Sequence, residues 1–136
     1  MLRIGALICG LVGLLASLTP ASAQLSPPPG GIKRTVLQKI DVPGTNYEVL
    51  FVLAEIPAKG TTGRHTHPGP ETGTLLEGET VLKIDGQPDK TVKPGESWQI
   101  PGGVVHDAIV GDKAAKIIVS YTVEKGKPPT TPAPAK

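Results

Sequence analysis

The sequence predicts an all-β protein, a single antiparallel sandwich or closed barrel. Gly (17) and Pro (15) are abundant among the 136 residues, and both break long helices. Short β-type runs recur between turn residues about 8 to 12 residues apart, a spacing typical of sandwiches and barrels. Hydrophobic residues make up 38% of the chain, enough for one small core. A chain of this length predicts one ordinary domain.

Residues 1–23 have the three parts of a secretory signal peptide. A short basic start ends at Arg3, residues 4–18 are apolar or small, and Ala21-Ser22-Ala23 is typical of a cleavage site. The apolar run is shorter than the roughly 20 residues of a membrane-spanning helix. We therefore expect cleavage after Ala23, a secreted or periplasmic protein, and no membrane attachment after cleavage. Cleavage also removes Cys9, the only cysteine, so the mature protein would have no disulfide and no thiolate ligand.

Proline-rich segments flank the predicted domain. Residues 24–32 are expected to form a Pro/Gly linker, and residues 125–136 a flexible Pro-rich tail that is extended and solvated. The β-rich domain is expected over residues 33–124. The formal charge is only +2 and the lysines are scattered, which argues against a nucleic-acid partner.

The expected strands are separated by turn signals such as Pro43-Gly44 and Lys93-Pro94-Gly95. Gly78 and Gly95 are expected where strands reverse, because glycine adopts a positive φ at little cost. The β-type runs are, in order, Thr35–Val42, Tyr47–Ile56, Leu75–Asp85 (with a turn at Glu77-Gly78), Thr91–Lys93, Ser97–Ile100, Val104–Val110 and Ala115–Glu124.

Large apolar side chains within these runs are candidates for the core. Phe51 shares a strand face with Val49 and Leu53, and we expect this face to be buried. Trp98, the only tryptophan, shares a face with Ile100. Two interpretations of Trp98 stay open, packing in the core or an aromatic wall of a substrate pocket.

All three histidines belong to one pattern that is suited to a metal ion. His65 and His67 form H-x-H, and residues i and i+2 of a strand point to the same face. Glu71 follows a short turn-rich spacer that could bring its carboxylate to the same point, and His106 follows Pro101-Gly102-Gly103. Three imidazoles and one carboxylate are a suitable ligand set for a divalent transition metal. A lone H-x-H pair would more often be structural.

Two stretches resemble the conserved motifs of the cupin family. Residues 60–78 (GTTGRHTHPGPETGTLLEG) resemble the first motif, G-x5-H-x-H-x3/4-E-x6-G, with one residue fewer before His65. Residues 95–110 (GESWQIPGGVVHDAIV) resemble the second motif, G-x5-P-x-G-x2-H-x3-N, with Val110 in the place of Asn. The sequence looks most similar to those of short single-domain cupins labelled quercetin-dioxygenase-like.

The resemblance implies a small antiparallel jelly-roll β-barrel with one divalent metal ion inside it. The metal ligands it implies are His65, His67, Glu71 and His106, and the ion could be Fe, Mn, Ni, Cu, Co or Zn. A detached Glu71 could also act as a catalytic acid or base, and Trp98 is a candidate for the substrate pocket. Arg64 and Asp107 flank ligands, but strand alternation directs them away from the metal or to the rim.

Different functions are compatible with such a site. One is a metal-dependent enzyme acting on a small oxygen-bearing molecule such as an enediol, catechol or flavonol, with dioxygenase-like chemistry slightly favoured. Lewis-acid isomerisation, decarboxylation or hydrolysis is a second chemistry. The alternatives are a binding protein for a metal or small ligand without turnover, and a structural barrel without metal. A homodimer is the family expectation.

Overall fold

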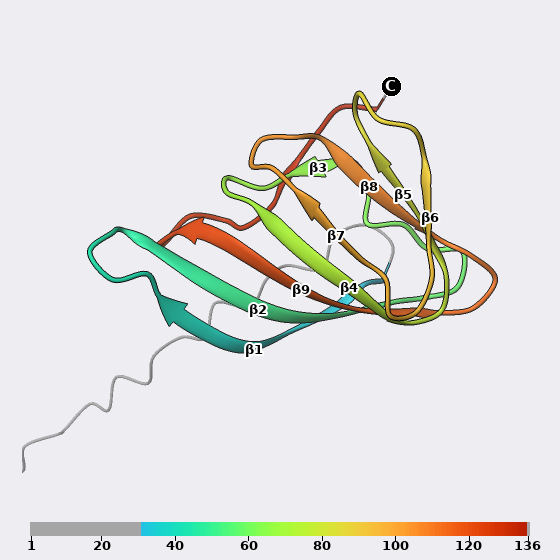
Figure 1. Ribbon diagram of the computed structural model, residues 1–136, viewed down its shortest axis with the longest axis horizontal. Coiled ribbons are helices and arrows are strands. Elements are labelled where there is room, and N and C mark those ends of the chain that lie inside the picture. Colours follow the sequence, from blue (N-terminus) through green and yellow to red (C-terminus); the bar gives the residue numbers. More distant parts are fainter. Residues whose placement is uncertain (1–30, 136) are drawn as a thin grey trace, which may run out of the picture.

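The computed structural model describes residues 31–135 as two antiparallel β-sheets that pack against each other (Figure 1). The predicted signal peptide and the linker up to residue 30 lie outside the described residues. Within residues 31–135 there is no helix, and hence none that could cross a membrane. The strands are β1 (Lys33–Asp41), β2 (Tyr47–Ile56), β3 (His65–Thr66), β4 (Glu71–Glu77), β5 (Thr80–Ile84), β6 (Lys90–Val92), β7 (Ser97–Ile100), β8 (His106–Val110), β9 (Ala115–Glu124) and β10 (Thr131–Pro132).

Each sheet combines strands that are far apart in the sequence. The first sheet has the order β1-β2-β9-β4-β7, and the second has the order β10-β3-β8-β5-β6. Ten residue pairs join β2 to β9 in uninterrupted register, from Tyr47 opposite Glu124 to Ile56 opposite Ala115. The chain passes repeatedly from one sheet to the other, as in a jelly roll. This arrangement confirms the predicted all-β class and barrel.

The core lies between the sheets and is supplied by alternate residues of each strand. In β9, every second residue from Ala115 to Val123 is buried. These residues pair with the buried positions of β2, as in the pairs Val52–Val119 and Leu50–Tyr121. The fully enclosed side chains include Ile56, Leu75 and Ile100, each at most 1% exposed.

The expectation that Phe51 is part of the core is wrong. Leu50 and Val52 point inward, so Phe51 lies on the outer face of the sheet, half-buried, with Ser120 opposite it on β9. β2 is apolar on both faces, and its own sequence therefore does not choose between them. The choice follows from β9, whose inward positions are all apolar or aromatic while its outward positions include Lys116 and Ser120, because a slip of one residue would bury the polar set.

The turns behave largely as expected, whereas several strand ends shift. Gly78 and Gly95 have φ values of 86° and 87°, in the region that favours glycine. β4 begins at Glu71 rather than Leu75, because Glu71 to Thr74 pair with both β7 and β9. β8 begins at His106 rather than Val104.

The expected solvated tail is in part built into the second sheet. Thr131 and Pro132 form β10 opposite Thr66 and His65 of β3, and Pro129 is buried. The red end of the ribbon accordingly runs beside β3 (Figure 1). Proline is tolerated here because β10 is an edge strand, where a missing N–H group costs no ladder bond. We call residues 127–135 the C-terminal strap.

Candidate metal centre

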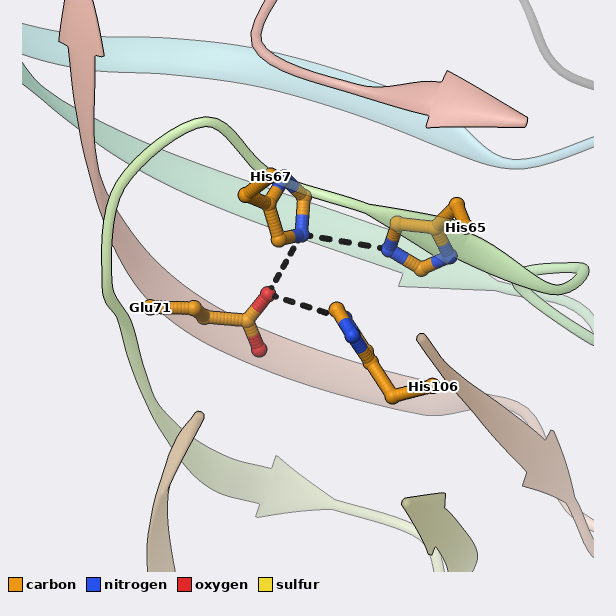
Figure 2. A group of neighbouring side chains, drawn as sticks. All are labelled: His65, His67, Glu71 and His106. Carbon is orange, nitrogen blue, oxygen red and sulfur yellow. Dashed lines mark hydrogen bonds and ion pairs between the residues drawn. The ribbon is translucent and has the colours of Figure 1, made fainter. Parts of the chain in front are cut away.

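The structure brings together the four residues that the sequence singled out as metal ligands. His65 lies in β3, His67 just after it, Glu71 at the start of β4 and His106 at the start of β8. All four are buried, with between 3% and 6% of their surface exposed, and one potential ligand atom of each lies within 4.8 Å of the others. Figure 2 shows the three rings and the carboxylate pointing toward one another.

Donor spacing in this cluster fits a single metal ion. His67 Nε2 lies 3.2 Å from His65 Nε2 and 2.7 Å from Glu71 Oε2, and His106 Nε2 lies 3.4 Å from Glu71 Oε2. Two ligands at right angles, each about 2.1 Å from an ion, are about 3 Å apart. His106 Nε2 is buried and has no hydrogen-bond partner among the described residues. A buried lone pair of this kind suits coordination.

Backbone carbonyl groups fix the orientation of all three rings. Nδ1 lies 2.6 Å from the Gly63 carbonyl oxygen in His65, 2.6 Å from that of Pro129 in His67, and 2.9 Å from that of Val104 in His106. A carbonyl oxygen only accepts, so each Nδ1 must donate its hydrogen, and each Nε2 of a neutral ring presents a lone pair to the cluster. Metal-binding histidines are held in the same way by an acceptor behind the ring.

The charges of the cluster also suit a cation. Burial lowers the pKa of His65 to about 4, so this ring is neutral at pH 7. Burial alone would raise the pKa of Glu71, but His106, His67 and the Trp98 N–H group outweigh burial and lower it far below its usual range. Burial opposes a proton on His106 as well, yet the Glu71 carboxylate raises the pKa of that ring. A divalent ion would take the place of that proton.

Trp98 is a partner of Glu71. Its indole Nε1 donates to Glu71 Oε1 at 2.8 Å, while Oε2 faces the histidines. Trp98 lies opposite Gly73 in the β4–β7 pairing, and a Cβ atom on Gly73 would approach the indole to 2.3 Å. Trp98 also lines the cavity beside the cluster, so it contributes to both the packing and the wall of the site.

Replacing Trp98 with Phe is expected to weaken metal binding by about 10-fold. The change keeps an aromatic ring over Gly73 but removes the N–H group that donates to Glu71 Oε1, and loss of such a supporting bond typically costs 10- to 100-fold in affinity. Competition with a chromophoric chelator measures the affinity. Ser97→Ala, on the exposed side of the same strand, is the matched control. Equal affinities of the three proteins would contradict the role of Trp98.

The two charged residues beside the ligands lie away from the cluster. Asp107 Oδ1 accepts hydrogen bonds from the hydroxyl groups of Thr61 and Thr62. Arg64 pairs with Asp85 through two nitrogens, at 3.0 and 2.8 Å, and its Nε donates to the Pro134 carbonyl group at 2.9 Å. Arg64 therefore ties β3 to the C-terminal strap at the rim.

Sequence reasoning missed two contributions to the site. The Pro129 carbonyl group comes from a segment that composition alone assigns to a tail, so no signal in the sequence would have found it. The second contribution is that of Gly102, where a Cβ atom would lie 2.8 Å from the Pro68 carbonyl oxygen. This close approach, with a hydrogen bond from Gly103 N to the His67 carbonyl oxygen, joins the two motifs.

A small cavity adjoins the cluster inside the barrel. Its volume is about 30 Å³, room for only a few non-hydrogen atoms. The walls are largely apolar, formed among others by Ala54, Ile56, Leu82, Ala108, Ile117 and Val119. The charged or titratable groups that line it are Arg34, His65, Glu71, His106 and Tyr121.

The chain is similar to known proteins in both sequence and structure. A family model described as a cupin domain matches residues 52–121. Germin-like protein 3-5 of Oryza sativa subsp. japonica is 30% identical over 118 residues, covering 79% of this chain and 52% of that protein. The chain thus spans about half the length of the curated relatives of this kind.

Two solved structures are similar at 26% identity and a TM-score of 0.60. One is a recombinant oxalate oxidase in complex with glycolate, with 82% of this chain and 59% of that chain covered. The other is the polyketide cyclase RemF from Streptomyces resistomycificus, with 77% and 72% covered. The segment matched by the family model contains all four clustered residues. The chain belongs to the cupin family.

Proposed function

We propose that this protein is a secreted, metal-dependent cupin enzyme that acts on a small oxygen-bearing molecule, with dioxygenase-like chemistry favoured. The buried group of three histidines and one glutamate beside a small cavity is the observation that supports it most. The structural relatives include an oxidase and a cyclase, so the family provides different reactions on this fold. The bound ion would supply Lewis acidity and, if redox-active, reactivity toward O₂.

The chain itself would hold the ion and shape its surroundings. His65, His67, Glu71 and His106 would bind it, and the carbonyl groups behind the rings keep the Nε2 atoms directed inward. The apolar walls would exclude bulk water, which strengthens electrostatic interactions at the ion. Glu71 is the candidate acid or base, once one of its oxygens is free of its neighbours.

Oxygen uptake by the metal-loaded protein tests the proposal. We expect O₂ consumption with at least one member of a panel of small diketones and enediols, and its loss in Glu71→Gln. Glu77→Gln is the matched control, an exposed carboxylate on the same strand. No uptake with any member of the panel would remove the support for an oxygenase.

A non-catalytic binding protein is the second candidate. It is favoured by the occupation of both Glu71 oxygens, one by Trp98 and the other by His67 and His106. Turnover that is lost in Glu71→Gln while the metal is retained would exclude this alternative.

Secretion and assembly are further parts of the proposal. The sequence of residues 1–23 supports export, and amino-terminal sequencing of the exported protein should begin at Gln24. Edge strand β1 exposes Val36, Leu37 and Ile40, each residue between 41% and 62% exposed, which supports a homodimer. Light scattering on the eluted protein measures its mass.

A further inference from the structure

The cavity beside the cluster is lined by one guanidinium group, that of Arg34. β1 pairs Arg34 with Ala54, whose side chain is buried on the inner face of the sheet. Opposite residues of an antiparallel pair point to the same face, so Arg34 is directed inward. It is the one residue of β1 that is half-buried rather than exposed, and it lines the same cavity as His65, Glu71 and His106.

Within residues 31–135, Arg34 is the one charged residue of β1 that has no ionic partner. Lys33 pairs with Glu55 at 2.9 Å, Lys39 with Glu48 at 2.8 Å, and Asp41 with Lys125 at 2.9 Å. No carboxylate of residues 31–135 lies within the 4.0 Å ion-pair distance of Arg34. Inside the barrel Arg34 lies beside the phenol of Tyr121, which lines the same cavity.

The resulting charge balance favours an anion. Among the cavity residues, Glu71 is the one carboxylate, and it faces the histidines and Trp98. A bound divalent ion would therefore leave an excess of positive charge around the cavity, shared between the ion and Arg34. A guanidinium group is also shaped to donate two parallel hydrogen bonds to a carboxylate.

We infer that the site binds a short-chain aliphatic carboxylate, with Arg34 pairing with its carboxylate group beside the metal ion. This inference rests on the proposed function, because it places the ligand at the same ion. The cavity of about 30 Å³ restricts the ligand to a few non-hydrogen atoms, and its apolar walls suit a short aliphatic chain. Arg34 is thus a specificity-determining residue that selects a negatively charged ligand over an uncharged one.

Calorimetric titration of the zinc-loaded protein with acetate tests the inference, with acetamide as the uncharged probe of similar size. We expect acetate to bind and acetamide not to bind. Arg34→Gln should weaken acetate binding by about 10- to 100-fold, because a hydrogen bond to a charged group is lost. The acetate affinity of Arg34→Lys should lie between those of the original protein and Arg34→Gln, since lysine keeps the charge but not the planar fork. Zinc content should be equal in all of these proteins.

Lys33→Gln is the matched control, because it removes the same charge one residue away on the outer side of β1. If Arg34→Gln and Lys33→Gln bind acetate as the original protein does, the inference is overturned and the metal function stands. If the protein retains no metal, the proposed function fails separately. Titration of the metal-free protein then decides the inference: acetate binding that Arg34→Gln abolishes supports it, and no binding overturns it.

Discussion

Removal of residues 128–136 is expected to lower the affinity for a divalent metal ion by about 10- to 100-fold. The deletion takes away the Pro129 carbonyl group, which accepts from His67 Nδ1 at 2.6 Å, and also strand β10. Without that acceptor the ring of His67 can rotate or change its tautomer, and its Nε2 lone pair is no longer fixed on the cluster. Chelator competition with the full and the shortened chain measures the change.

A shorter deletion separates the carbonyl group from the rest of the strap. A chain that ends at Pro132 keeps Pro129 and β10 but loses the bonds of Arg64 to Ala133 and Pro134. Its affinity should stay close to that of the full chain. Circular dichroism shows whether each shortened chain is folded. A folded chain ending at Lys127 with unchanged affinity would exclude a role for Pro129 at the metal.

The metal-free protein is expected to lose about 3 kcal/mol of folding free energy as the pH falls from 6.5 to 4. The pKa of His65 is about 4 in the folded protein, whereas the ordinary value is 6.5. Below pH 6.5 the unfolded chain binds a proton at His65 that the folded protein excludes, so acid favours unfolding. The contribution is complete above the ordinary pKa and is lost progressively as the pH falls toward 4. One pKa unit corresponds to about 1.4 kcal/mol.

Urea unfolding of the chelator-treated protein across this pH range measures the slope. The raised pKa of His106 affects the free energy of unfolding mainly above pH 6.5. The stabilisation that it provides is present below pH 6.5 and is lost as the pH rises. Glu71, whose pKa is lowered, adds to the acid loss only when the pH approaches its ordinary value of 4.5. In His65→Gln the slope between pH 6.5 and 5 should be much flatter. The same slope in both proteins would show that His65 is not held neutral by burial.

The sequence predicted which four side chains cluster more completely than it predicted the strands. His65, His67, Glu71 and His106 stand at fixed spacings within two motifs, and the structure brings all four together. Their convergence needs long-range pairing, such as that of His65 with His106, which a local pattern does not reveal. The spacing of the two motifs predicted that the four side chains converge, although the strand pairing was unknown.

Features that depend on tertiary contacts could not be predicted from the sequence. Phe51 was assigned to the wrong face because β2 is apolar on both sides and only its pairing with β9 decides which side is buried. Proline content indicated a free tail, although an edge position accepts prolines and the carbonyl group of Pro129 finds a buried donor. Arg34 gave no local signal, because its lack of an ion pair within residues 31–135 is visible only against the ion pairs of its neighbours.

Elemental analysis tests the central claim, that the three histidines and Glu71 together hold one metal ion. The protein from Gln24 onward is purified without a His-tag or chelator, beside His65→Ala/His67→Ala and the control Glu77→Gln. We predict about one equivalent of Fe, Mn, Ni, Cu, Co or Zn in the original protein and in the control, and none in the double variant. A folded original protein that binds none of these metals, even after reconstitution with each, would contradict the account.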